Sequence, residues 1–396
     1  MATESELKVL QVVEPGVDGV FRHVEGLVEY LLEQHGVKSG LAYSSQRGSE
    51  RLQSLVERVR KADGPVVDLD TGNSPQIRDL IAYRRLRKLI RGWKPQVVHA
   101  HSSKAGGLCR LRRLPGSPEV LYTPNAYYGM GHRNRSETRI YNAAEKWLGR
   151  RGFTINVSPE ERAFAIERLG LEPSGLREIS NAVDFRKFRP PGSDHEKGRA
   201  REQLGIPRSA TVIGSIGRLS FQKDPETLYR AVSVVRARHP AIPWCLLHAG
   251  DGDTTTRDDL SKLSRQLGIE SMVVRPAYRS DSETLYRAMD LFCLSSRYEG
   301  LPLTVLEALA SNLPIALTDG PGLRSFGGRR YEFSQVFFGA VEQPASLADA
   351  IEKCWRAIQS TRCEHRTKAE PHFAIESCYR EILDLYRERT SQKPVR

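Results

Sequence analysis

Residues 291–310 read LFCLSSRYEGLPLTVLEALA. The apolar run at 291–294 predicts a buried strand, and the residues that follow Pro302 predict a helix. Pro302 suits the first helical position, because its missing N–H costs nothing there and its φ is already helical. We therefore expect a strand, a loop and a helix in succession, which is the repeating unit of parallel α/β sheets.

Two carboxylates, Glu299 and Glu307, stand eight positions apart around this helix start. Glu299 is expected in the loop and Glu307 in the second helical turn, with the N–H groups of residues 300–304 facing the same space. Unpaired N–H groups at a helix N-terminus bind phosphate well, and the carboxylates can accept hydrogen bonds from sugar hydroxyls. The stretch therefore predicts a nucleotide-sugar site, although an ordinary helix start with glutamates on its surface has the same residues.

Strand and helix patterns alternate along all 396 residues, which indicates two doubly wound parallel α/β domains. The expected strands are 9–13, 66–69, 96–100, 120–123, 153–158 and 177–180, then 211–216, 244–248, 272–275, 291–294 and 314–318. The expected helices include one over 20–31, one capped by Ser74-Pro75, and a final one over 375–388. A polar stretch at 190–194 suggests domains over 1–190 and 195–374.

Five other segments accompany the glutamate pair in order. They are GRLSFQKD at 217–224, ISNAVD at 179–184, FRP at 188–190, AGDG at 249–252 and YRAMD at 286–290. As a set, these segments resemble the retaining nucleotide-sugar glycosyltransferases of family 4 over nearly the whole chain. The resemblance implies the GT-B fold, in which two Rossmann-like domains face a cleft and residues 375–396 cross back to the first domain. It also implies that the first domain binds the acceptor and the second binds the donor.

The resemblance assigns roles residue by residue. Arg218 and Lys223 would hold the donor diphosphate, Glu299 the donor sugar hydroxyls and Glu307 the ribose. The expected catalytic set is Glu299, Arg218, Lys223 and Asn125. The expected donor-binding set is Gly16, Gly19, Gly217, Tyr278, Arg279, Gly300, Leu301, Pro302, Leu303 and Glu307. No metal ion and no cofactor are expected, because the cations and the helix N-terminus would supply the positive field that stabilises the leaving diphosphate.

The first domain offers a glycine-bearing loop with Gly16 and Gly19, where the family lets the backbone approach donor and acceptor. This loop lacks Gly-x-Gly-x-x-Gly, which argues against a dinucleotide-dependent oxidoreductase. The run HAHSSK at 99–104 has no carboxylate beside it, so no metal site is expected there. Its Ser103 and Lys104 are expected near a helix N-terminus that faces the cleft.

Two positions depart from the family pattern. Asn125 follows Thr-Pro where many members have a histidine that positions the donor sugar, and an amide cannot act as an acid or base near neutral pH. His101 and His132 are candidate substitutes. Asn312 stands where the family has glycine after the signature helix.

The net charge of +12 is concentrated in one stretch. Residues 81–150 hold 15 Lys and Arg against 3 Asp and Glu, whereas the rest of the chain is balanced. Such clustering favours an anionic partner, either a membrane surface, a diphosphate-bearing acceptor or nucleic acid, or it makes a solvated basic face. No nucleic-acid-binding module is recognisable, so no nucleic-acid partner is expected.

The six cysteines are scattered, with no Cys-x-x-Cys pair, which argues against a zinc site and a disulfide framework. No apolar run approaches the ~20 residues that a membrane-spanning helix needs. The N-terminus MATESE is acidic and unlike a signal peptide. We expect a cytoplasmic protein that is peripheral on the inner face of the cell membrane.

Together these features predict a retaining glycosyltransferase that uses a nucleoside-diphosphate sugar, with UDP favoured over GDP. The acceptor is expected to be a saccharide, linked to polyprenyl diphosphate, in the assembly of a bacterial surface polysaccharide such as O-antigen or capsule. Two alternatives stay open: a nucleotide-sugar epimerase on a similar fold, which needs no acceptor, and a basic nucleic-acid-binding protein.

Overall fold

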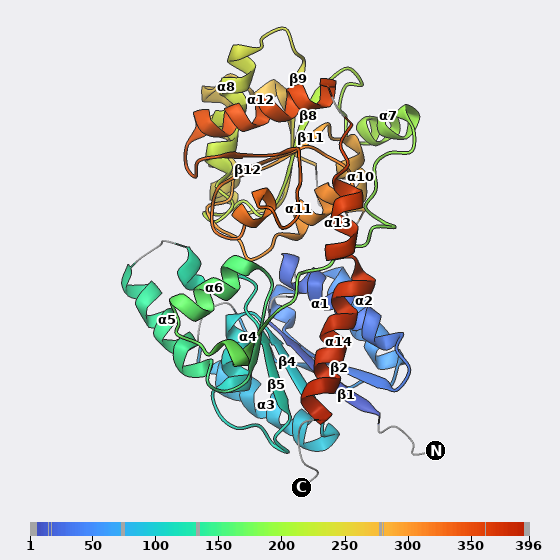
Figure 1. The fold of residues 1–396 in the computed structure, drawn as a ribbon, viewed down its shortest axis with the longest axis vertical. Helices are drawn as coiled ribbons and strands as arrows, with labels where there is room; N and C mark the ends of the chain where they lie inside the picture. The colour runs from blue at the N-terminus through green and yellow to red at the C-terminus, as the bar shows by residue number, and fades with distance from the viewer. Residues whose placement is uncertain are drawn as a thin grey trace. The chain divides into compact units, whose positions relative to one another are not determined.

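The computed structural model describes residues 6–14, 16, 18–72, 76–131, 135–276, 279, 281–360 and 362–391. The chain divides into two compact units, each built on one parallel sheet (Figure 1). Unit 1 comprises Met1–Asn181 and Ile375–Arg396, and unit 2 comprises Ala182–Ala374. The prediction of two doubly wound α/β sheets is confirmed.

Unit 1 has a seven-stranded sheet in the order β3-β2-β1-β4-β5-β6-β7, and every pair is parallel. Its strands are β1 (Leu7–Val13), β2 (Val37–Tyr43), β3 (Val66–Asp68), β4 (Val97–His101), β5 (Glu119–Thr123), β6 (Phe153–Asn156) and β7 (Leu176–Glu178). Its helices are α1 (Asp18–Leu32), α2 (Glu50–Lys61), α3 (Arg78–Trp93), α4 (Ser103–Arg110), α5 (Arg135–Leu148), α6 (Pro159–Glu167) and α14 (Ile375–Ser391). The predicted cap at Ser74-Pro75 lies outside the described residues.

Unit 2 has a six-stranded parallel sheet in the order β10-β9-β8-β11-β12-β13. Its strands are β8 (Thr211–Ile216), β9 (Trp244–Ala249), β10 (Val273–Val274), β11 (Leu291–Leu294), β12 (Ile315–Thr318) and β13 (Val336–Gly339). Its helices are α7 (Asp194–Gln203), α8 (Pro225–Arg238), α9 (Thr254–Gln266), α10 (Ser282–Ala288), α11 (Leu303–Ala310), α12 (Pro344–Ser360) and α13 (His365–Phe373). Strands β8 and β11 are buried because α8 and α12 pack on the sheet with residues such as Val232 and Ile351.

The boundary between the units lies before the predicted linker. Val183 forms a parallel bridge with Ala374 and donates its N–H to the Phe373 carbonyl at 2.8 Å. Phe188 is buried and meets the Tyr286 ring edge-on at 5.5 Å. Residues 182–190 therefore pack with unit 2, whereas the sequence assigned them to the first domain.

Helix α14 returns the chain to unit 1, where it lies beside α1 (Figure 1). The Tyr379 hydroxyl on α14 donates to the His23 carbonyl on α1 at 3.3 Å. A Cβ on Gly26 of α1 would lie 2.6 Å from the same hydroxyl, so the two helices are in close contact. The predicted return of the C-terminal helix is thus confirmed.

The six cysteines are free thiols, and all except Cys363 are buried. Among the described residues, no helix is both long and apolar enough to cross a lipid bilayer.

Candidate active site

The strand order places the candidate site at the switch point of the unit 2 sheet. Strands β8 and β11 are neighbours, and the chain winds in opposite directions on either side of them. Ligands bind at such a switch point, outside the carboxyl ends of the strands. The loop at 217–224 follows β8 and the loop at 295–302 follows β11, so two segments distant in sequence meet at this edge.

Direct hydrogen bonds join the two loops. The Arg297 N–H donates to the Gln222 carbonyl at 2.8 Å, and the Ser295 hydroxyl contacts the carbonyls of Lys223 and Asp224, each at 2.8 Å. These bonds hold the predicted phosphate loop and the glutamate loop as one structure.

Glu299 is 5% exposed and is held by three side chains. Its Oε1 lies 2.6 Å from Lys223 Nζ and 2.6 Å from the donating Ser296 hydroxyl. Its Oε2 accepts from Gln222 Nε2 at 3.3 Å. From the sequence, Lys223 was expected to bind the donor diphosphate and Glu299 the sugar hydroxyls. In the structure, the two side chains form an ion pair with each other.

The backbone around Glu299 is equally constrained. Its N–H donates to the Pro321 carbonyl at 2.8 Å. Gly322 has a φ of +78°, and a Cβ there would lie 2.0 Å from the Glu299 carbonyl oxygen. Only glycine allows this close approach, so the turn at 320–322 fixes the position of the glutamate loop.

Glu307 lies in α11, in the second turn as predicted, and is 2% exposed. The Tyr286 hydroxyl, from α10, donates to Glu307 Oε2 at 2.6 Å and approaches the Thr304 carbonyl at 3.2 Å. Tyr286 therefore orients the carboxylate. The segment 286–290 indicates no role for this side chain, because the local sequence does not show which hydroxyl contacts which carboxylate.

Helix α11 begins at Leu303, one residue later than predicted. Pro302 has a ψ of 121° and precedes the helix, and its carbonyl accepts the Val305 N–H at 3.1 Å. The first-turn N–H groups of Leu303 and Thr304 therefore have no acceptor within the helix. Thr304 Oγ1 is buried without a hydrogen-bond partner in the described part of the chain. Polar donors thus gather at this helix start.

The glycine loop after β8 lies close to Lys223. A Cβ on Gly217 would lie 3.4 Å from the Lys223 side chain, which runs over the glycine. The Gly217 N–H donates to the Ala249 carbonyl at 3.0 Å, and a Cβ on Gly250 would lie 1.8 Å from the Gly217 carbonyl. Arg218 is exposed on this loop. The close backbone approach between 217 and 250 explains why residue 250 is glycine, whereas a Cβ on Gly217 would make only an ordinary contact.

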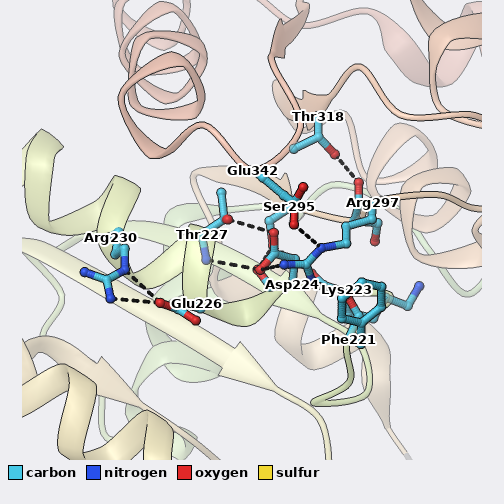
Figure 2. Close-up of polar contacts among 11 residues, drawn as sticks. Phe221, Lys223, Asp224, Glu226, Thr227, Arg230, Ser295, Arg297, Thr318 and Glu342 are labelled. Atoms are coloured by element: carbon cyan, nitrogen blue, oxygen red, sulfur yellow. Dashed lines mark hydrogen bonds and ion pairs between the residues drawn. The ribbon is translucent and has the colours of Figure 1, made fainter. Parts of the chain in front are cut away.

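Arg297 is a residue of this site whose role its local sequence does not indicate (Figure 2). Its guanidinium donates to the Phe221 carbonyl at 2.5 Å, pairs with Asp224 at 3.1 Å and with Glu342 at 2.8 Å. It also lies 4.1 Å from the centre of the Phe221 ring. Burial raises the pKa of Asp224, and the Arg297 charge opposes that rise. Arg297 thus ties the phosphate loop to the glutamate loop.

The other residues that were predicted to bind the donor lie in different surroundings. Arg279 forms a two-point ion pair with Asp281, at 2.9 and 2.7 Å, which raises the pKa of Arg279 and lowers that of Asp281. Tyr278 lies outside the described residues. Gly300, Leu301 and Leu303 are buried around the helix start. The guanidinium of Arg279 is therefore paired with Asp281, two residues along the chain.

The predicted residues of unit 1 lie at the carboxyl edge of its own sheet. The buried Gly16 accepts the Ser49 hydroxyl at 2.9 Å, and Gly19 is exposed with open space around its Cα. Asn125 follows β5 with a φ of +54°, and its Nδ2 donates to the Thr123 carbonyl at 3.4 Å. The amide of Asn125 is therefore half-buried within its own turn.

His101 does not point to an open site. Its Nε2–H donates to Gln11 Oε1 at 2.8 Å, inside a buried network that includes His99 and Tyr386. Burial lowers its pKa well below the usual value. His101 is therefore a core residue rather than a substitute for the family histidine, and His132 lies outside the described residues.

Lys104 lies in the first turn of a helix, as the sequence predicted. Helix α4 begins at Ser103, and the Lys104 ammonium pairs with Asp79 at 2.9 Å and donates to the Gly72 carbonyl at 2.5 Å. Lys104 therefore links α4 to α3. No group of three or more His, Cys, Asp or Glu among the described residues is arranged to hold a metal ion.

Two family models match the chain. The Glycosyl transferases group 1 model matches residues 196–366, and the Glycosyltransferase Family 4 model matches residues 17–187. A UDP-Gal:alpha-D-GlcNAc-diphosphoundecaprenol alpha-1,3-galactosyltransferase from Escherichia coli is 29% identical over 280 residues, which cover 67% of this chain and 71% of that protein. A D-inositol 3-phosphate glycosyltransferase from Corynebacterium urealyticum is 26% identical over 314 residues, which cover 75% and 72%.

Solved structures share the whole fold. Anabaena Alr3699/HepE, in complex with UDP-glucose, matches with a TM-score of 0.78 and 17% identity, over 96% of this chain and 100% of that one. WaaG, a glycosyltransferase involved in lipopolysaccharide biosynthesis, matches with a TM-score of 0.71 and 14% identity, over 96% and 99%. With two Rossmann-like units that each match a glycosyltransferase family model, the chain belongs to the group 1/family 4 glycosyltransferases of the GT-B fold.

Proposed function

We propose that this enzyme transfers a sugar from a UDP-sugar, with retention of configuration, to a hydroxyl of a lipid-linked saccharide. The observation that carries the donor site is the pair of buried carboxylates, Glu299 and Glu307, on either side of the α11 N-terminus. The UDP-glucose in the Anabaena structure supports the choice of base. The diphosphoundecaprenol acceptor named for the Escherichia coli relative supports the choice of acceptor and a place on the cytoplasmic membrane face, in surface-polysaccharide assembly.

The diphosphate would lie against the first-turn N–H groups of α11, with Lys223 and Arg218 beside it. A lysine ammonium has three N–H donors, so Lys223 can keep its contact with Glu299 and still donate to a phosphate oxygen. As the bond from the anomeric carbon to phosphate oxygen breaks, charge grows on the leaving UDP. Fixed positive groups stabilise that charge without reorganising, so we propose a reaction that needs no metal ion.

In the same step, the acceptor oxygen bonds to the anomeric carbon on the face that the phosphate leaves. The acceptor proton passes to a phosphate oxygen of UDP, so atoms and charge balance without an enzyme nucleophile. Glu299 would hold sugar hydroxyls and Glu307 the ribose hydroxyls, with Tyr286 keeping the Glu307 carboxylate in place.

A thermal-shift panel of UDP, GDP, ADP, NAD and a short RNA tests the donor site. We expect UDP to raise the Tm selectively and Glu307→Ala to abolish that rise. Glu299→Ala is expected to remove sugar transfer while the protein stays folded, and near-wild-type turnover would take Glu299 out of the site. UDP-sugar that is converted to another UDP-sugar without acceptor would indicate the epimerase instead.

A further inference from the structure

Unit 1 carries a large groove of about 1460 Å³ that the sugar-transfer site does not use. It lies between α3 and the segment 108–118, and the first residues of β5 and β6 contribute to it. Because β5 and β6 begin there, the groove is at the amino edge of the sheet, whereas the ligand edge of a parallel sheet is the carboxyl edge.

Seven of the 22 residues that line the groove are arginines. Six of them are Arg84, Arg87, Arg110, Arg112, Arg113 and Arg151. The carboxylates in the lining already have basic partners: Asp79 pairs with Lys104 at 2.9 Å, and Glu119 pairs with Arg389 at 3.3 Å.

Most of the lining arginines keep their charge unbalanced. Arg110 pairs with the buried Glu145 at 2.9 Å. Within the described ranges, the other five have no carboxylate within ion-pair distance, and Arg84, Arg112, Arg113 and Arg151 are exposed. The groove is therefore a concentrated, uncompensated positive surface.

Large apolar side chains are exposed in the same groove. Leu80 is 63% exposed, Leu111 50% and Trp147 46%. Arg151 lies 3.9 Å from the centre of the Trp147 ring and donates to the Leu111 carbonyl at 2.6 Å, which holds the indole at the edge of the groove. Three large apolar side chains are therefore exposed within one basic groove, rather than scattered singly over the surface.

Exposed apolar residues are also concentrated in this part of the chain. Seven of the nine large hydrophobic residues exposed among the described ranges lie between residues 77 and 147. They are Ile77, Leu80, Ile81, Leu111, Ile140, Tyr141 and Trp147. This is the stretch that also holds the excess of Lys and Arg, so exposed apolar and basic residues are concentrated in one region of the chain.

We propose that this groove, with the exposed side of α3, is the surface by which the enzyme lies on an anionic phospholipid bilayer. Basic residues bind the headgroup phosphates, while Trp and Leu enter the boundary with the acyl chains. Nucleic acid would account for the arginines but not for the exposed Leu80, Leu111 and Trp147. Membrane binding would bring the enzyme to its lipid-linked acceptor, so this proposal rests on the acceptor proposed above.

Vesicle co-sedimentation of the full chain tests the proposal, without donor or acceptor. We expect binding to phosphatidylcholine vesicles that contain phosphatidylglycerol, little binding to phosphatidylcholine alone, and a strong decrease at high salt. Arg112→Glu/Arg113→Glu should weaken binding by roughly 25-fold or more, because each basic residue near an anionic surface contributes roughly fivefold. Trp147→Ser should weaken the part of binding that remains at high salt.

The control is Arg199→Glu/Lys262→Glu, which changes the net charge equally on exposed residues of unit 2 and should bind like the wild type. Equal losses in both double variants, or no vesicle binding at low salt, would overturn the proposal. So would binding of a short RNA that Arg112→Glu/Arg113→Glu removes, in the absence of vesicle binding. The UDP-induced Tm shift of the wild type is a separate readout. If UDP does not raise the Tm, the donor proposal fails while the vesicle result stands.

Discussion

Lys223 Nζ lies 2.6 Å from Oε1 of Glu299, although 76 positions separate the two residues. The side chain of Glu299 is 7% exposed and that of Lys223 is 18% exposed. Strands β8 and β11 are neighbours in the sheet, and the loops that follow them bring the two charges together. The pair therefore connects the expected phosphate loop with the expected sugar-binding glutamate.

Lys223→Met is expected to destabilise unit 2, because it leaves the Glu299 carboxylate buried without its cation. Removing one partner of a buried pair costs about 3 kcal/mol or more. Glu299→Gln keeps an acceptor for the Ser296 hydroxyl and should cost less. Calorimetry of both single variants and the double variant measures the coupling, and strictly additive losses would show that the pair does not act as a unit.

Tyr286→Phe should weaken UDP binding while the protein remains folded. The change removes the hydroxyl that donates to Glu307 at 2.6 Å and leaves a buried carboxylate short of a donor. A lost buried hydrogen bond of this kind costs about 1–3 kcal/mol. UDP titration calorimetry checks the affinity, with Tyr229→Phe, which loses a 3.4 Å contact to His248, as the matched control. Equal affinities for both variants would contradict the role of Tyr286.

Arg297→Met should raise the KM for the donor, because it releases the phosphate loop from the glutamate loop. The change removes contacts with the Phe221 carbonyl, Asp224 and Glu342. Arg230→Met is the control, since Arg230 forms an exposed pair with Glu226 on α8 (Figure 2), and such pairs contribute only about 0–1 kcal/mol. Steady-state kinetics should show a raised KM in Arg297→Met, partial recovery in Arg297→Lys and no change in the control.

Much of the fold was predictable because buried parallel strands are short apolar runs. Strands β8 and β11 have the bounds that the sequence predicted. Strand β2 was missed because Lys38, Ser39 and Gly40 interrupt its apolar pattern, and the short β13 was missed as well. These strands depend on pairing with β1 and β12, which the local sequence does not show.

The local elements that carry the candidate site residues were predictable, but the contacts between these residues were not. Glu299, Glu307 and Lys223 follow from motifs, and their positions depend on local helix and strand starts. Their contacts with each other and with Tyr286 depend on strand order, which brings distant segments together. His101, a candidate substitute for the family histidine, is buried by tertiary packing that its local sequence does not show.

His23→Phe is expected to make unit 1 less sensitive to acid. Both ring nitrogens of His23 are buried without hydrogen-bond partners in the described part of the chain, and burial lowers its pKa to about 4. Its neighbours include His101 on β4 and Tyr379 on α14, whose ring centres lie 5.6 and 5.7 Å away. Phenylalanine preserves the ring contacts and removes the unpaired nitrogens.

The direction of this pH effect on stability follows from the protons that the folded and unfolded chains bind. As the pH falls below about 6.5, the unfolded chain binds a proton at His23 that the folded chain does not bind until about pH 4. The free energy of unfolding of the wild type therefore falls over this window, by roughly 2 kcal/mol between pH 7 and pH 5 for this one residue. The buried Glu161, whose pKa is raised to about 7, acts in the opposite direction in both proteins and cancels from the difference.

Calorimetric Tm values of wild type and His23→Phe, measured from pH 7 to pH 5, should therefore diverge, with the variant retaining more stability in acid. His35→Phe changes an exposed histidine in the same unit and should follow the wild type. Parallel Tm curves for the wild type and His23→Phe would mean that His23 becomes protonated in the folded state, and that water reaches a ring that the structure buries completely.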